Sequence, residues 1–197
     1  MDDKYLPICQ AINQLLLKQA RVVLGIDGHS GAGKSTLAQN LAGHYGAAVI
    51  SMDHFYLPAD LRTPERICSP GETIHWERML SEVAPHLRAG KAFSYQVFDC
   101  GAMCYTHSVQ IHAAPLVIVE GCYALHPNLA DVYNLRVFLC CSPAVQRERI
   151  LKRNITNATQ FFERWIPLEN AYFKRYGMPN QDHMVINTEF VTELVER

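Results

Sequence analysis

Residues 21–41 restrict the fold of this chain more than any other segment does. An apolar, β-branched run breaks there into a glycine-rich turn, and the turn leads into residues whose apolar side chains recur at helical spacing. The fixed positions of the pattern G-x-x-x-x-G-K-[ST] are occupied by Gly28, Gly33, Lys34 and Ser35. This combination predicts a β-strand, a phosphate-binding loop and an α-helix, in that order. A merely flexible glycine turn would not explain a lysine and a serine at this spacing.

The residue types of the loop suit the binding of phosphate groups. Backbone N–H groups must converge on phosphate oxygens, so side chains beyond hydrogen are excluded where the chain approaches most closely. The helix that begins near Lys34 directs the positive end of its dipole at the anion, the lysine reaches the β- and γ-phosphates, and Ser35 offers a hydroxyl to Mg²⁺. We therefore predict a nucleoside triphosphate site with Mg²⁺, whose loop contacts are Gly28, His29, Ser30, Gly31, Ala32, Gly33, Lys34, Ser35 and Thr36.

The composition favours one globular domain that occupies residues 1–197. The 197 residues are 49% hydrophobic and contain no low-complexity tract, so the chain can bury a full core. A net charge of −1 with interspersed signs gives no basic stripe, which argues against a nucleic acid partner. No apolar run approaches the length of a membrane span, and the N-terminus is acidic, unlike a signal peptide.

Cysteine usage bears on the cellular compartment. The seven cysteines form an odd set without a C-x-x-C pair, so reduced thiols are favoured over disulfides or zinc. We therefore expect a cytoplasmic protein whose partner is a small-molecule substrate, with no membrane and no nucleic acid among its partners. Whether copies of the chain assemble into a homo-oligomer stays open.

Alternating strand and helix patterns predict an α/β fold. The first twenty residues have the spacing of an amphipathic helix. Beyond the strand before the loop, apolar runs typical of buried strands occur at residues 47–53, 115–121, 135–141 and 183–187. Together they predict a doubly wound, five-stranded parallel sheet of the P-loop nucleotide hydrolase type, with a short terminal helix after the last strand.

Two carboxylates stand at the predicted carboxyl ends of strands. Asp53 ends the second strand, and Glu120 ends the strand at 115–121. Because ligands of open α/β sheets bind beyond the carboxyl ends of the strands, both should point into the crevice beside the phosphate loop. An unpaired buried carboxylate is costly, and Mg²⁺ would compensate Glu120. The alternative for Asp53 is a helix cap or a surface carboxylate.

Residues 57–73 are polar, rich in proline and too long for a tight connection, so they predict a functional loop. This loop carries Arg62 and Arg66. The apolar spacing of residues 76–87 then predicts a helix, in which Pro85 should introduce a kink.

Residues 92–112 predict an excursion from the parallel sheet. Two runs that alternate with period two are separated by a short connection that contains glycine, which is typical of an antiparallel hairpin. On this hairpin Tyr95 and Asp99 share one face.

Ser142 and Pro143 suit the cap and the first position of a helix, and residues 143–160 carry several arginines. At about 100° per residue, Arg149 and Arg153 share one face of this helix, whereas Arg147 lies about 200° from Arg149. Only the first two arginines can act together. We expect this segment to form a helical lid over the nucleotide site.

Four segments in this order carry a resemblance to a known family: GHSGAGKS, SMDHFYLP, VIVEGCYAL and RERILKRN. With them the chain resembles, over about residues 21–187, the uridine kinase-like P-loop kinases, which also include phosphoribulokinase and pantothenate kinase. The resemblance implies that ATP, with Mg²⁺, phosphorylates a hydroxyl of a small molecule. It also implies that Asp53 is the base near the acceptor hydroxyl, Glu120 the Walker B carboxylate near Mg²⁺, and Arg149 and Arg153 the lid cations.

The chain departs from uridine kinases proper at three places. The segment SPGETIHW stands where they carry a His-Pro pair and an acidic residue, and Gln146 stands where a further lid arginine is usual. The segment FDCGAM leaves only Asp99 as a match after the hairpin strand. The residues predicted to bind the acceptor are Asp53, Tyr56, Arg62, Arg66, Tyr95 and Asp99, although aromatic residues at such spacings are also common in cores.

Three functions stay open. The family resemblance favours the phosphorylation of a nucleoside such as uridine. If Arg62 and Arg66 converge, their guanidinium groups would suit an acceptor with a carboxylate or phosphate, but Arg66 could instead pair with a surface glutamate such as Glu65, Glu72 or Glu77. The third function is a nucleotide-dependent switch that binds a protein partner, although the chain lacks the Asn-Lys-x-Asp segment of a GTPase switch.

Overall fold

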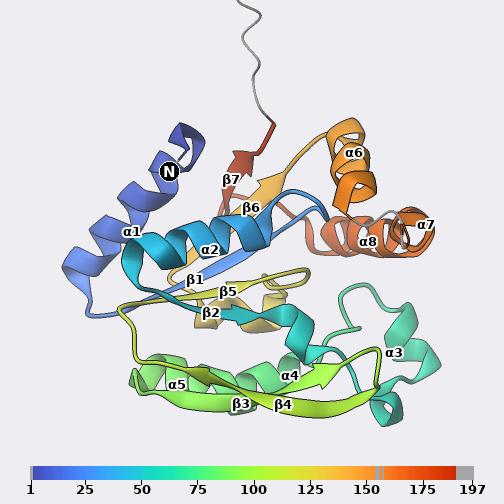
Figure 1. The fold of residues 1–197 in the computed structure, drawn as a ribbon, viewed down its shortest axis with the longest axis horizontal. Helices are drawn as coiled ribbons and strands as arrows, with labels where there is room; N and C mark the ends of the chain where they lie inside the picture. Colours follow the sequence, from blue (N-terminus) through green and yellow to red (C-terminus); the bar gives the residue numbers. More distant parts are fainter. Residues whose placement is uncertain (1, 154–155, 157, 190–197) are drawn as a thin grey trace, which may run out of the picture.

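The computed structural model describes residues 2–153, 156 and 158–189, and Figure 1 shows their arrangement. Five parallel strands form one sheet in the order β2-β5-β1-β6-β7. These strands are β1 (Val22–Gly28), β2 (Ala48–Ser51), β5 (Leu116–Glu120), β6 (Leu135–Cys140) and β7 (Met184–Asn187). The predicted α/β fold with a five-stranded parallel sheet is confirmed.

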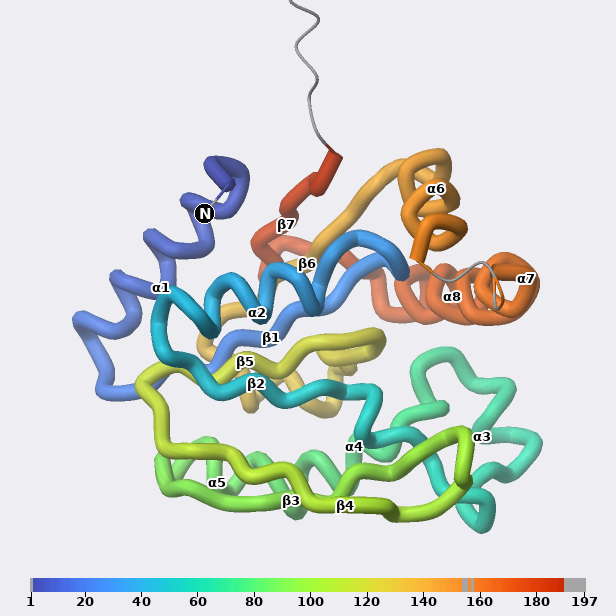
Figure 2. Tube along the Cα trace, in the orientation of Figure 1, coloured from blue at the N-terminus to red at the C-terminus, as the bar shows by residue number. Residues whose placement is uncertain are grey.

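One face of the sheet is covered by the first two long helices. These are α1 (Leu6–Lys18), which η1 (Asp3–Tyr5) precedes, and α2 (Lys34–Tyr45), which lies alongside β1 in Figure 1 and Figure 2. Their apolar side chains form a core cluster with the strands, which includes Ile8, Ile12, Leu37, Leu24 and Ile26. Every residue of β1 is buried, because this central strand has a neighbour on each side and packing on both faces.

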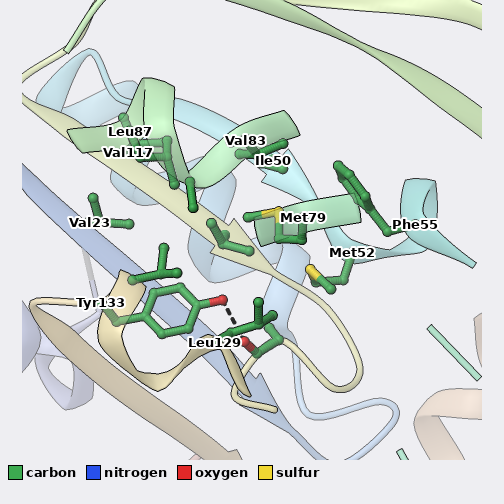
Figure 3. Packing of buried hydrophobic residues seen from close by; sticks show 14 of the residues in the cluster. Val23, Ile50, Met52, Phe55, Met79, Val83, Leu87, Val117, Leu129 and Tyr133 are labelled. Carbon is green, nitrogen blue, oxygen red and sulfur yellow. Dashed lines mark hydrogen bonds between the residues drawn. The ribbon is translucent and has the colours of Figure 1, made fainter. Parts of the chain in front are cut away.

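The opposite face is covered by a helical segment and a hairpin. The segment consists of α4 (Trp76–Arg78), η4 (Met79–Val83) and α5 (Ala84–Ala89), and the antiparallel hairpin consists of β3 (Phe93–Asp99) and β4 (Cys104–Ile111). Figure 3 shows how Met79, Val83 and Leu87 pack in one cluster with Ile50 of β2 and Val117 of β5. The hairpin predicted within residues 92–112 is confirmed.

Two helical segments widen immediately before a proline. The helix predicted at 76–87 forms the wider π-type turn η4 just before Pro85. In the same way η7 (Phe161–Trp165) precedes Pro167, near the start of α8 (Ile166–Tyr176). Proline has no N–H for the carbonyl four residues earlier, and its ring would clash with that carbonyl. A local widening of the turn lets each segment continue through its proline.

Six further elements complete the described part of the chain. They are η2 (Met52–Phe55), η3 (Ala59–Leu61), α3 (Pro64–Cys68), η5 (Pro127–Val132), α6 (Pro143–Arg153) and α7 (Ala158–Gln160). The second strand ends at Ser51 rather than at Asp53, because the chain turns into η2. Residues 154, 155 and 157 of the predicted lid, and the predicted terminal helix, lie outside the described residues. None of the described helices has the length and apolar character needed to span a bilayer.

Arg78 fastens the hairpin to the helical segment beside it. Its side chain is 4% exposed, and its guanidinium donates hydrogen bonds to the carboxylate of Glu82 at 2.8 Å and to the carbonyl of Gln96 in β3. Its Cζ also lies 4.7 Å from the ring centre of Phe55 and 4.9 Å from that of Tyr105 in β4. A single buried cation therefore joins α4, η2 and both strands of the hairpin.

We predict that Arg78→Met lowers the free energy of unfolding by about 2–4 kcal/mol, because it leaves the carbonyl of Gln96 without its donor and removes two contacts with aromatic rings. Urea denaturation followed by circular dichroism measures the change. The exposed Arg88 of α5 offers a matched control, and Arg88→Met should change stability by less than about 0.5 kcal/mol. Equal effects of the two substitutions would contradict the role given to Arg78.

Candidate active site

A cavity of about 670 Å³ lies beside the phosphate loop, where β1, β2 and β5 end. Segments that are far apart in the sequence line it together: the phosphate loop, η2, the end of β5, the loop at 56–73, the end of α6 and the start of α8. The volume is in the range of pockets that hold small ligands. The position agrees with the rule that open α/β sheets bind ligands beyond the carboxyl ends of their strands.

The turn after β1 has the backbone geometry that a phosphate loop needs. Gly33 has a φ of 92° directly before α2 begins. Gly28 has a φ of 132°, and a Cβ at this position would lie 1.9 Å from the carbonyl oxygen of Leu139 in β6, so only glycine fits. The buried ammonium of Lys34 donates to the carbonyls of Gly28 at 2.7 Å and His29 at 3.1 Å.

Ser35 and Glu120, the two residues predicted to bind the metal, contact each other. The hydroxyl of Ser35 donates to Oε2 of Glu120 at 3.0 Å. Burial raises the pKa of the Glu120 carboxyl above its ordinary value, although the hydrogen bond from Ser35 opposes the shift. A hydroxyl and a carboxylate on the cavity wall fit Mg²⁺ that is bound mainly by nucleotide phosphates and water. Across the described ranges, no group of three or more His, Cys, Asp or Glu side chains could hold a metal by itself.

Asp27 is a buried carboxylate beneath the loop that the sequence analysis missed. One of its oxygens accepts the N–H of Gly28 at 2.7 Å, and the other accepts the N–H of Leu125 at 3.0 Å and the hydroxyl of Tyr172 at 3.3 Å. Burial raises the pKa of Asp27 to about 6, against the attraction of the Lys34 ammonium. A signal was present in the sequence, because a carboxylate inside a continuous apolar strand must have buried partners.

Glu169 of α8 is the second acidic residue that the sequence analysis missed. Its buried carboxylate lines the cavity and accepts hydrogen bonds from Ser30 in the phosphate loop and from Cys122. Burial alone would lower the pKa of the Lys34 ammonium, but acidic groups that include Glu169 and Asp27 raise it above its ordinary value. No pattern in the sequence distinguishes this glutamate from the solvated ones of an ordinary helix.

Three of the residues predicted to bind the acceptor line the cavity: Asp53, Tyr56 and Arg62. Asp53 is exposed there, and Glu120 lines the same cavity, where burial and, to a smaller extent, the charge of Asp53 raise its pKa. Burial raises the pKa of the Tyr56 hydroxyl well above its ordinary value. Nε of Arg62 donates to the carbonyl of Leu57 at 2.7 Å, which fixes the start of its guanidinium against the loop.

The other three residues predicted to bind the acceptor have structural contacts away from the cavity lining. Arg66 forms an ion pair with Glu77 at 2.7 Å, so the two arginines of the loop do not converge, and the surface pairing considered for Arg66 is present. Tyr95 is buried, and its hydroxyl lies 2.9 Å from Nδ1 of His54. Asp99 accepts two backbone N–H groups of the hairpin turn, which is a capping role.

The two arginines predicted to act together on α6 separate in the structure. Arg149 donates to the hydroxyl of Thr188 at 2.9 Å, to its carbonyl at 2.7 Å and to the carbonyl of Gly31 at 3.3 Å. It therefore braces the outside of the phosphate loop and does not line the cavity, whereas Arg153 does. A second arginine at the cavity is Arg164 of η7, which the sequence analysis did not name.

Fold and site together define the class of this protein. A parallel sheet with β1 at its centre leads into a glycine-rich loop, and a lysine and a serine begin the next helix. A carboxylate at the end of the neighbouring strand contacts that serine. These are the features of a P-loop protein that binds a nucleoside triphosphate, and the cavity beside the loop gives room for a second small molecule.

Comparison with known proteins agrees with this class, although no family model matches the chain. The chain is 27% identical over 154 residues to uridine kinase of Chlamydia pneumoniae. The matched region covers 74% of this chain and 68% of that relative. Its fold is similar to that of a gluconokinase from Sinorhizobium meliloti 1021, with a TM-score of 0.51, 16% identity, and coverage of 87% of this chain and 85% of that chain.

A further solved structure has a more similar fold than the gluconokinase. YFH7 of Saccharomyces cerevisiae, described as a candidate P-loop containing kinase with a circular permutation, has a TM-score of 0.68 and 13% identity and covers 96% of this chain and 100% of its own. The chain is therefore similar in sequence to a uridine kinase and in fold to a candidate P-loop containing kinase. The phosphate-loop pattern at Gly28–Ser35 by itself indicates a nucleoside triphosphate as the ligand.

We predict a distinctive pH dependence for Asp27→Asn. The folded-state pKa of about 6 lies above the ordinary 3.8, so the stability contributed by Asp27 is fully present below pH 3.8 and is lost as the pH rises through 6. The free energy of unfolding of the wild type, minus that of the variant, should fall by about 2–3 kcal/mol between pH 4 and pH 7. Urea denaturation of both proteins across this range measures the difference.

Asp99 gives the control of opposite sign. Backbone N–H groups of the hairpin turn hold the pKa of Asp99 below its ordinary value, so its contribution is present above the ordinary pKa and is lost as the pH falls. The free energy of unfolding of the wild type, minus that of Asp99→Asn, should therefore grow as the pH rises. A constant difference for Asp27→Asn would contradict the burial of an ionisable carboxylate beneath the loop.

Proposed function

We propose that this protein is a kinase that transfers the γ-phosphoryl group of ATP to a hydroxyl of a small molecule, with a nucleoside such as uridine as the first candidate acceptor. The observation that carries the proposal is the shared cavity, because Lys34, Ser35 and Glu120 line it together with Asp53. Phosphoryl transfer depends on positioning and on neutralisation of charge, so donor, metal and acceptor must meet in one site.

The nucleotide half of the site is formed by the loop from Gly28 to Thr36. Its N–H groups and the start of α2 would hold the phosphates, and Lys34 would contact the β- and γ-phosphates. The hydroxyl of Ser35 and the carboxylate of Glu120 would hold Mg²⁺, which supplies charge neutralisation at the phosphates when bound. The contact between Ser35 and Glu120 supports this assignment, since it brings both metal ligands to one point on the wall.

The acceptor half of the site has Asp53 at its centre. This carboxylate lines the same cavity as Lys34, Ser35 and Glu120, so an acceptor hydroxyl beside Asp53 would share one site with the triphosphate. Asp53 would orient that hydroxyl and take its proton as the new P–O bond forms. Arg153, which lines the same cavity, would neutralise charge on the transferred group.

Aromatic side chains on the cavity wall support a nucleoside as the acceptor. Tyr56, Tyr123 and Trp165 all line the cavity, and a planar base stacks well on such rings. The sequence similarity to uridine kinase of Chlamydia pneumoniae supports the same acceptor class.

We predict that Asp53→Asn lowers kcat by roughly 10²–10⁴, the range for loss of a positioned base, and leaves the Kd of ATP within about threefold of the wild-type value. Steady-state kinetics with uridine and titration with ATP measure the two effects. Asp60→Asn in η3 is a suitable control, because Asp60 is exposed and does not line the cavity. An equal loss of ATP affinity would instead make Asp53 a metal ligand or a structural residue.

A second candidate acceptor carries a carboxylate or a phosphate besides its hydroxyl. Arg62 and Arg164 line the cavity, and within the described part of the chain neither forms an ion pair. A guanidinium binds such anions with two parallel hydrogen bonds, whereas a neutral nucleoside offers no anionic group. Arg62 was expected to converge with Arg66, but in the structure it shares the cavity wall with Arg164 instead.

A coupled kinase assay separates the two acceptors. We expect phosphorylation of uridine or cytidine, with kcat/KM changed less than about threefold by Arg62→Gln or Arg164→Gln. If the substrate is instead pantothenate, glycerate or a sugar phosphate, the same substitutions should lower kcat/KM by about 10- to 100-fold, because each removes a hydrogen-bonded charge. Arg66→Gln is the matched control, since Arg66 is held by Glu77 outside the cavity. Turnover of none of these compounds would contradict both acceptor classes.

A further inference from the structure

The carboxylate of Glu169 is held by three donors at the wall of the cavity. Its side chain is 3% exposed. Oε2 accepts the backbone N–H of Ser30 at 3.0 Å, and Oε1 accepts the hydroxyl of Ser30 at 2.5 Å and the thiol of Cys122 at 2.8 Å.

These contacts join three parts of the site that the chain supplies separately. Ser30 belongs to the phosphate loop, Cys122 follows the carboxylate Glu120 by two residues, and Glu169 belongs to α8. The same helix provides Leu168 to the cavity wall. A shift of Glu169 would therefore displace the middle of the phosphate loop and the wall that faces it.

The position of Ser30 makes the contact relevant to nucleotide binding. Ser30 lies between Gly28 and Gly33, so its backbone is part of the turn that must present N–H groups to the phosphates. Glycines give this turn its shape and also make it deformable. Glu169 fixes both the N–H and the hydroxyl of Ser30, and Gln146 fixes its carbonyl with a hydrogen bond of 3.0 Å.

We infer that Glu169 is a positioning residue, which holds Ser30 so that the remaining N–H groups of the phosphate loop converge on the nucleotide. This inference rests on the proposed function for its nucleotide but assigns a role that the phosphate-loop pattern does not contain. The polar contacts of Glu169, rather than its negative charge, carry the role. A glutamine can reproduce them, because its oxygen can accept the N–H of Ser30 while its amide donates to the hydroxyl and the thiol.

Glu169→Leu and Glu169→Gln form the decisive pair of variants. Leucine fills a similar volume without polar contacts, so we expect its Kd for ADP to rise about tenfold and kcat to fall by 10- to 100-fold, as a misplaced phosphate loop requires. Glu169→Gln should restore both values to within about threefold of the wild type. Titration with ADP needs no acceptor, so it tests the inference whether or not an acceptor is known. All measurements are made well below the melting temperature of each variant.

Two controls separate positioning from general stability. Glu163→Gln in η7 makes the same replacement at an exposed glutamate, so it should leave the Kd for ADP and kcat unchanged. If Glu169→Leu fails to fold, Ser30→Ala removes one of the same hydrogen bonds, and it should raise the Kd for ADP by about two- to fivefold. In the double variant Ser30→Ala/Glu169→Leu, the effects should not be additive, because the two side chains form one contact.

Several outcomes would overturn the inference. A Glu169→Leu variant with wild-type Kd and kcat, and only a lower melting temperature, would make the residue purely structural. A Glu169→Gln variant as impaired as Glu169→Leu would show that the charge itself matters. If the wild type bound no nucleotide, the proposed function would fall as well, whereas normal nucleotide binding in every variant would overturn the role of Glu169 alone.

Discussion

The carboxylate of Asp27 holds together the parts of the chain on which the site depends. Its hydrogen bonds come from Gly28 at the end of β1, from Leu125 after β5 and from Tyr172 on α8. Three connections that leave the sheet are thereby fixed at one buried point. A carboxylate at this depth is unfavourable by itself, and the three donors with the nearby Lys34 ammonium make it tolerable.

Features that depend on neighbours in the sequence were the ones that sequence reasoning recovered. The phosphate loop is a short pattern in which Gly28 and Gly33 need positive φ values, and the structure has both. The strands are continuous apolar runs, because a central parallel strand is buried on both faces. Ser35 and Glu120 were both predicted at the nucleotide end of the sheet, and the structure brings them into contact there.

Features that depend on packing between distant segments were not recoverable. Arg66 was expected beside a ligand, but the helical segment after its loop brings Glu77 within reach. Tyr95 and Asp99 were expected on one face of the hairpin, but the strand pairing is irregular between Gln96 and Phe98. Tyr95 is buried and its hydroxyl contacts His54, whereas Asp99 is exposed and caps a turn. Glu169 illustrates the opposite error, because nothing local marks a helix glutamate that meets the phosphate loop across 139 positions of sequence.

The contacts of Arg149 have a practical consequence for handling the protein. This guanidinium ties Gly31 of the phosphate loop to Thr188, whose N–H continues the pairing of β7 by donating to Cys140 of β6. Shortening the chain before residue 188 would remove the anchor of α6 together with that strand contact. A rigid fusion partner joined directly after Thr188 could displace this residue and, through Arg149, Gly31 of the phosphate loop. A flexible spacer between the two would avoid that displacement.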